Sequence, residues 1–132
     1  MYTEKLIEHF KHPRNVGEIP DADGIGTIGD PSCGDYLCVF IKVSGGRLSE
    51  VKFKVYGCPA AIATTSILTE IAVGKTLEEA LEITYLDIAE ALGGLPDPKM
   101  HCSNLGAEAL FYAIMDYRAR NGSGGASLSS DG

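Results

Sequence analysis

The sequence predicts an α+β fold: a small three-stranded antiparallel sheet with helices packed on one face. Segments with the alternating pattern of half-buried strands come first along the chain, whereas from residue 59 onward the apolar residues recur at helical spacing. The chain has 132 residues, of which 45% are hydrophobic and 22% are charged. This composition is typical of a globular protein, and the length is sufficient for one domain with its own core.

A short amphipathic helix is expected before the strands. Residues 2–10 (YTEKLIEHF) place Leu6, Ile7 and Phe10 on one side at helical spacing. Prolines and glycines in the following segment, residues 11–24, predict that the helix ends there.

Two strands form a predicted hairpin in the middle of the first half. Residues 36–43 (YLCVFIKV) and 48–57 (LSEVKFKVYG) alternate between apolar and other residues. The pair Gly45 and Gly46 between them is typical of a tight hairpin turn. A shorter strand at 24–30 (GIGTIGD) is expected to pair with this hairpin and complete the sheet.

Four helices are expected after the sheet. The first is apolar almost all round, and its polar residues are mostly small, which predicts burial inside the core. Thr76 and Glu79 have the spacing of a capping box at the start of the second. The expected helices span 59–74, 76–83, 85–92 and 103–120; residues 1–120 form the predicted domain, and 121–132 have the composition of a flexible Gly/Ser-rich tail.

The charge and the ends of the chain limit the classes of partner. The formal net charge is −7, which disfavours nucleic acid and anionic membrane surfaces, because both attract Lys and Arg. No apolar run approaches the length of a membrane span, and the first residues mix charged and apolar side chains, unlike a signal peptide. A cytoplasmic protein with reduced thiols is therefore expected.

Three of the four cysteines lie at predicted element ends. Cys33 precedes the first long strand, Cys58 precedes the apolar helix, and Cys102 precedes the last helix. The N-terminus of a helix favours a thiolate, which is the form that binds metals or acts as a nucleophile. Asp35 and His101 stand beside two of these thiols, so they are candidate further ligands.

Cys38 differs from the other three cysteines. Along its strand it alternates out of phase with Leu37, Val39 and Ile41, so it is expected on the opposite face of the sheet. A small, half-apolar strand residue is the simplest interpretation, and no ligand role is predicted for it.

Four motifs resemble a known family. They are HPRNVG at 12–17, CGD at 33–35, FKVYGCPAAIATTSILTE at 53–70 and KMHCSNLGAEAL at 99–110. In this order and at these separations they resemble the IscU/NifU N-terminal type of iron–sulfur cluster assembly scaffold. The resemblance extends over residues 2 to about 120 and implies the same α+β layer.

The resemblance implies a non-enzymatic scaffold that assembles a labile [2Fe–2S] cluster and transfers it to other proteins. Cys33, Cys58 and Cys102 match the cluster ligands of the family, and Cys102 also matches the cysteine that receives sulfur from a desulfurase. Asp35 and His101 match the two candidates for the fourth ligand. Three thiolates with a carboxylate or imidazole hold a cluster less completely than the usual four cysteines, which suits transfer.

The resemblance also implies partners: a cysteine desulfurase, an electron donor such as a ferredoxin, and recipient apo-proteins or carrier proteins. Members served by a dedicated heat-shock chaperone carry LPPVK, whereas residues 95–99 here are LPDPK, so the resemblance leaves a chaperone partner open. Tyr2 matches an aromatic position linked to self-association as a homodimer, although a surface tyrosine explains it equally well.

Two other interpretations are open at this stage. The same thiols with Asp35 or His101 would also hold tetrahedral zinc, and family members bind zinc there when cluster-free. Alternatively, Cys102 would be the nucleophile of a thiol enzyme with His101 as its base. Adjacent residues rarely give a base good geometry toward a thiol, and no substrate-binding motif accompanies them, so this second interpretation is disfavoured.

Overall fold

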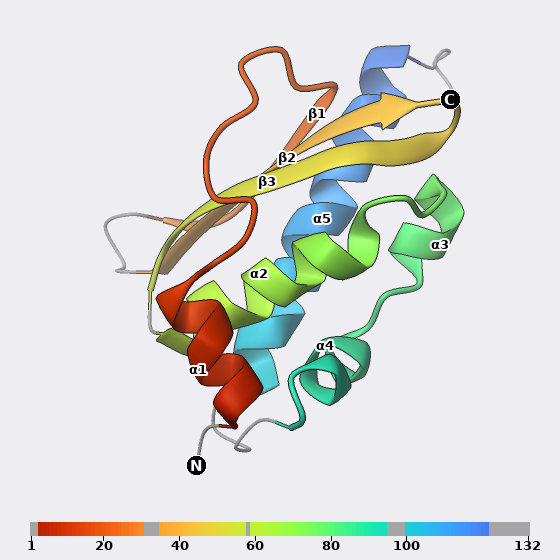
Figure 1. Cartoon of the computed structure of the whole chain (residues 1–132). Coiled ribbons are helices and arrows are strands. Elements are labelled where there is room, and N and C mark those ends of the chain that lie inside the picture. The colour runs from red at the N-terminus through yellow and green to blue at the C-terminus, as the bar shows by residue number, and fades with distance from the viewer. Residues whose placement is uncertain (1–2, 31–34, 58, 95–99, 122–132) are drawn as a thin grey trace.

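A computed structural model describes residues 3–30, 35–57, 59–94 and 100–121. One antiparallel sheet, in the strand order β1-β2-β3, packs against helices on one of its faces (Figure 1). The α+β prediction is confirmed. The elements are α1 (Glu4–Lys11), β1 (Gly24–Asp30), β2 (Asp35–Ser44), β3 (Arg47–Tyr56), α2 (Pro59–Ala72), α3 (Leu77–Leu81), α4 (Tyr85–Ala91) and α5 (Met100–Asn121).

The hairpin turn and the third strand form as expected. Gly45 and Gly46, between β2 and β3, have φ angles of +60° and +78°, a backbone conformation that favours glycine. β1 pairs with β2 from Gly24, opposite Ile41, to Asp30, opposite Asp35. All three strands therefore run side by side along most of their length.

The two faces of β2 have different partners. Leu37 and Val39 point into the main core, which the sheet shares with α2 and α5. Cys38 and Phe40 point to the other face, where Ile19 from the segment before β1 covers them. The prediction that Cys38 faces away from the main core is confirmed, and the covering segment leaves it only 6% exposed.

The apolar helix α2 lies in the core as predicted. Its small polar residues Thr64, Thr65, Ser66 and Thr69 are buried. The three threonine hydroxyls donate to carbonyls of the preceding turn, as in the 2.8 Å bond from Thr65 Oγ1 to Ala61 O, whereas the Ser66 hydroxyl is paired with His9 and Arg14. Small side chains that bond their own helix allow α2 to be enclosed on several sides.

The structure corrects two expectations about helices. In α1, Leu6 is buried together with His9, whereas Ile7 and Phe10 are each 39% exposed. The apolar side predicted from Leu6, Ile7 and Phe10 was therefore wrong, because α1 turns a polar ring toward α2. The last helix begins at Met100 and not at residue 103.

Candidate functional site

One end of the sheet brings together the chain segments next to three predicted ligands. Asp30 at the end of β1 pairs with Asp35 at the start of β2, and Tyr36 pairs with Tyr56 at the end of β3. The backbone of Asp35 is thus part of this sheet end. Cys33 and Cys58 lie outside the described residues; in the sequence, Cys33 lies between β1 and β2, and Cys58 follows β3 by two positions.

Helix α5 runs antiparallel to β1 and brings its first turn toward the same end. A Cβ on Gly24 would lie 2.2 Å from the Ala113 carbonyl oxygen, and one on Gly26 would lie 2.0 Å from the Ala109 carbonyl oxygen. Only glycines permit such a close approach of strand and helix backbones. The direction of α5 relative to β1 follows from these two contacts.

The contact between Gly26 and Ala109 gives a common point from which to measure along β1 and along α5. Four strand residues separate Gly26 from Asp30, about 13 Å, and seven helical residues separate Ala109 from Cys102, about 10 Å. The first turn of α5, with His101 and Cys102 in its backbone, is therefore nearly level with the end of β1. Because the last helix was expected over 103–120, His101 and Cys102 were expected just before it; both lie inside α5 instead.

Helix α2 packs against α5 close to the start of both. A Cβ on Gly106 of α5 would lie 3.2 Å from Leu68 Cδ2 and 3.6 Å from Thr65 Oγ1 of α2. Met100, where α5 begins, is six residues from Gly106, or about 9 Å along the axis. Pro59, where α2 begins, is six residues from Thr65 and nine from Leu68, or about 9 and 14 Å. Both helix starts therefore lie near one crossing, with Cys58 next to one of them in sequence.

An aromatic pair borders this sheet end. The rings of Tyr36 and Tyr56 have centroids 6.0 Å apart, and Tyr56 is 61% exposed. The nearby Cys38 thiol is the main reason that the pKa of Tyr36 is raised above its ordinary value. Thr27 donates a hydrogen bond to Cys38 Sγ at 3.6 Å. Cys38 is thus buried, already partnered and on the outer face of the sheet.

A polar network that the sequence did not predict fixes the segment between α1 and β1. His9 Nδ1 lies 2.8 Å from Ser66 Oγ of α2, and the same hydroxyl accepts the backbone N–H of Arg14 at 2.9 Å. Asn15, at φ +61°, donates from Nδ2 to Thr69 Oγ1 at 2.9 Å. This network joins HPRNVG to α2, and its only sequence signal was the matched motif itself.

The same segment also extends the sheet. Gly17 N donates to Phe53 O at 2.8 Å, and Phe53 N donates to Asn15 O at 3.0 Å, so the segment covers the edge of β3.

Burial is the main cause that lowers the pKa of His9, and the Arg14 charge lowers it further. His9 is therefore neutral in the folded protein at neutral pH.

Two further findings concern metal-ligand groups and membrane-spanning helices. Within the described ranges, no three His, Cys, Asp or Glu side chains group around a position for a metal ion. The predicted ligands Cys33 and Cys58 are not part of those ranges, so the predicted set stays a prediction. No helix in the described part of the chain has both the length and the apolar character needed to cross a bilayer.

Comparison with known proteins identifies the family. The family profile described as "NifU-like N terminal domain" matches residues 1–123. The chain belongs to this family. Over 92% of its length, this chain is 59% identical to iron–sulfur cluster assembly scaffold protein IscU 1 of Archaeoglobus fulgidus, and the match covers 80% of that protein. It is 46% identical, over 90% of its length, to the scaffold protein IscU of Escherichia coli K12, covering 95% of it.

Solved structures agree with the NifU-like fold. A putative iron–sulfur cluster assembly scaffold protein for the SUF system, from Fervidobacterium islandicum, superposes with a TM-score of 0.67 at 27% identity. The match covers 86% of this chain and 96% of that one. The sequence-based recognition of the family and of its α+β layer is therefore confirmed.

Proposed function

We propose that this chain is a scaffold on which an iron–sulfur cluster is assembled and from which it is transferred to apo-proteins. Relatives that share up to 59% of its residues are named as such scaffolds. The structural observation that carries the proposal is the approach of the α5 start to the sheet end that holds Asp35. Cluster ligands far apart in sequence require such a convergence.

We infer that the cluster is of the [2Fe–2S] type, with Cys33, Cys58 and Cys102 as thiolate ligands. Asp35 or His101 completes the set. Soft thiolates suit iron–sulfur clusters, and a fourth ligand that protonates more readily than a buried thiolate makes release easier. A cluster with three thiolates and a carboxylate is negatively charged, and the N-termini of α2 and α5 stabilise negative charge nearby.

The remaining roles follow from the same proposal. Cys102 accepts sulfur from a cysteine desulfurase, an electron donor such as a ferredoxin supplies electrons, and apo-proteins or carrier proteins receive the cluster. Zinc occupies the same residues in the cluster-free form. The chain acts in the cytoplasm without catalysing a reaction of its own, and Tyr2, outside the described residues, is the candidate contact of a homodimer. The chaperone segment 95–99 also lies outside the described residues.

Single substitutions test the ligand set. Cys33→Ser, Cys58→Ser and Cys102→Ser should each prevent a stable cluster after anaerobic reconstitution, measured by visible absorption and by bound iron and sulfide. Cys38→Ser is the matched control and should assemble normally, because Cys38 is buried on the other sheet face. Loss of the cluster in Cys38→Ser with retention in Cys58→Ser would contradict the assignment. A single essential cysteine would instead favour a thiol enzyme.

Asp35→Ala tests the role of the carboxylate in release. The variant should still form a cluster but should pass it to an apo-ferredoxin several-fold more slowly than the unmodified chain. Transfer is followed by the spectrum of the recipient. Equal transfer rates would exclude a role of Asp35 in cluster release.

A further inference from the structure

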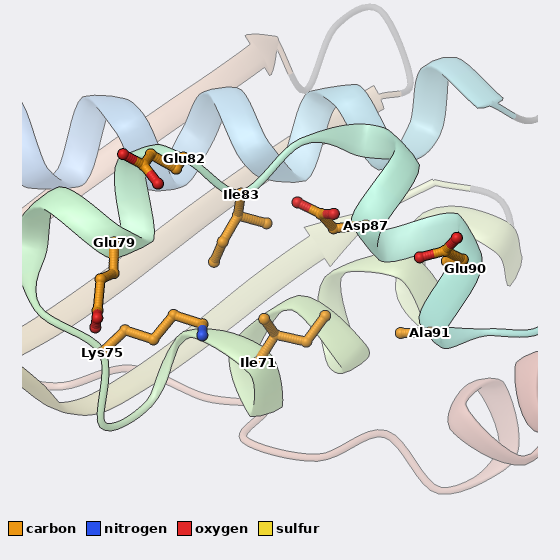
Figure 2. Close-up of a pocket in the computed structure, with 8 residues that line it drawn as sticks. All are labelled: Ile71, Lys75, Glu79, Glu82, Ile83, Asp87, Glu90 and Ala91. Carbon is orange, nitrogen blue, oxygen red and sulfur yellow. The ribbon is translucent and has the colours of Figure 1, made fainter.

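A groove lies apart from the predicted cluster ligands, between the end of α2 and helices α3 and α4 (Figure 2). It has a volume of about 580 Å³. At one end of the groove is Lys75, whose carbonyl oxygen accepts the backbone N–H of Leu48 at 2.9 Å. Leu48 is near the start of β3, whereas the predicted site is at the end of that strand. An occupant of this end would leave the predicted cluster site accessible.

The walls of the groove are strongly acidic. Glu79 and Glu82 from α3 and its C-cap, and Asp87 and Glu90 from α4, contribute four carboxylates, against one cation, Lys75. All four acidic residues are exposed. In the described part of the chain, the side-chain carboxylates of Glu82 and Glu90 form neither a hydrogen bond nor an ion pair, and only their backbones are hydrogen-bonded. The groove therefore has a net negative charge that the described residues do not neutralise.

Two of these carboxylates are held in position by helix capping. Glu79 Oε1 accepts the Thr76 N–H at 3.0 Å, and Asp87 Oδ2 accepts the Thr84 N–H at 2.9 Å. A capping box fixes the side chain against its own backbone. Each carboxylate is thus presented in a fixed place, and ordering it on binding costs little side-chain entropy.

Between the acidic walls, three apolar residues contribute the smaller part of the lining, and one of them, Ile83, is largely buried. Ile71 of α2, Ile83 between α3 and α4, and Ala91 of α4 form this surface, with Ile71 and Ile83 near the middle of the view (Figure 2). A ligand that matches this surface needs apolar groups as well as positive charges.

We propose that this groove docks a short basic amphipathic segment of a partner protein. The lysines or arginines of that segment would face the carboxylates of α3 and α4, and its apolar side chains would contact Ile71 and Ile83. A divalent cation fits less well, because no three acidic or other ligating side chains of the described residues group around one point. Nucleic acid and anionic lipid are repelled by the net charge of −7.

A synthetic peptide provides the probe. An amphipathic peptide of about 14 residues, built from lysine and leucine with lysines on one face, is titrated into the isotope-labelled full chain at about 50 mM salt. Backbone amide shifts should be largest in α3, in α4 and at the end of α2. Largest shifts at the sheet end or on α5 would overturn the proposal.

Matched variants separate this groove from general attraction to an acidic protein. Glu82→Gln with Glu90→Gln should weaken peptide binding at least about fivefold. Glu4→Gln with Glu108→Gln removes the same charge from exposed positions outside the groove and should change binding less than about twofold. Equal loss in both double variants would overturn the proposal.

A third comparison tests the apolar surface. Ile71→Ser should weaken binding of the peptide about threefold or more and should leave the binding of spermine, which has charge without leucines, unchanged. Spermine binding as tight as that of the peptide would show simple cation attraction and would contradict docking of an amphipathic segment. These titrations use the cluster-free chain, so their outcome is independent of the proposed cluster assembly.

Discussion

The close contact between β1 and α5 makes a sharp prediction for Gly26→Ala. The new Cβ would lie 2.0 Å from the Ala109 carbonyl oxygen and 2.5 Å from the Ala113 nitrogen. Both are backbone atoms of a helix, so no side-chain rotation can relieve the overlap. Since real Cβ contacts are essentially never below 3.0 Å, α5 must move away from β1 by about 1 Å.

The magnitude follows from what that movement separates. Leu110 and Ile114 of α5 are buried in the main core, each worth roughly 1.5–3 kcal/mol of burial. A gap of 0.5–1 Å removes about a quarter to a half of the dispersion attraction at a contact. With the neighbouring alanines included, the free energy of unfolding should fall by roughly 3 kcal/mol, at the upper end of the usual cost of overpacking.

Gly106→Ala is the matched control: Gly106 lies on α5, the helix that Gly26 of β1 contacts. Its Cβ would meet Leu68 Cδ2 at 3.2 Å, the end of a flexible side chain that can give by a few tenths of an ångström. Alanine also gains about 1 kcal/mol of helix propensity over glycine. Urea unfolding of the cluster-free chain, followed by circular dichroism, should therefore give Gly106→Ala a stability within about 1 kcal/mol of the unmodified chain.

Either of two results would refute this reasoning. One is a cost below about 1 kcal/mol for Gly26→Ala, which would mean that α5 does not lie as close to β1 as described. The other is an equal cost for both alanine variants, which would mean that the cost is general to glycine replacement. Because α5 carries Cys102, Gly26→Ala should also assemble less cluster than Gly106→Ala under identical reconstitution.

Further predictions concern pH and the buried thiol. Burial lowers the pKa of His9 in the folded protein, so the unfolded chain binds more protons as the pH falls. The contribution of neutral His9 to the free energy of unfolding should be fully present above the unfolded pKa of about 6.5. On acidification from pH 7.5 to 5.5 the free energy of unfolding should fall, by at most about 1.4 kcal/mol per pH unit. His9→Asn keeps a group near Ser66 but does not titrate, and an unchanged slope in urea unfolding of this variant would assign the effect elsewhere. Cys38→Ser should lower the free energy of unfolding by about 1 kcal/mol, because a hydroxyl replaces a buried sulfur, and a cost above about 3 kcal/mol would contradict its role as a small packing residue.

The sequence predicted the sheet well because period and turn chemistry agree there. The alternation in β2 correctly separated Leu37 from Cys38, and the glycine pair correctly marked the hairpin turn. It also predicted the burial of α2, since an all-round apolar helix with small polar residues has no solvated face. Local sequence patterns predicted the structure correctly wherever the preferred local conformation is also the one that the packing of the whole chain requires.

The failures have a common physical cause, which is contact between distant segments. Periodicity placed Ile7 and Phe10 inside, but His9 is buried because Ser66, 57 residues away, gives its ring a hydrogen-bond partner. The closeness of α5 to β1 depends on Gly26 meeting Ala109, which no local pattern reveals. The ligand set was inferred from motif resemblance for the same reason.

The most direct test of the proposed function is cluster assembly followed by transfer. The chain is reconstituted anaerobically with ferrous iron, cysteine and a desulfurase, and iron, sulfide and visible absorption are measured before and after addition of an apo-ferredoxin. Equal iron and sulfide with a reddish-brown spectrum, lost from this chain as the ferredoxin gains its own, is the predicted result. A colourless protein that retains only zinc would contradict the proposed function and would favour a zinc-binding protein.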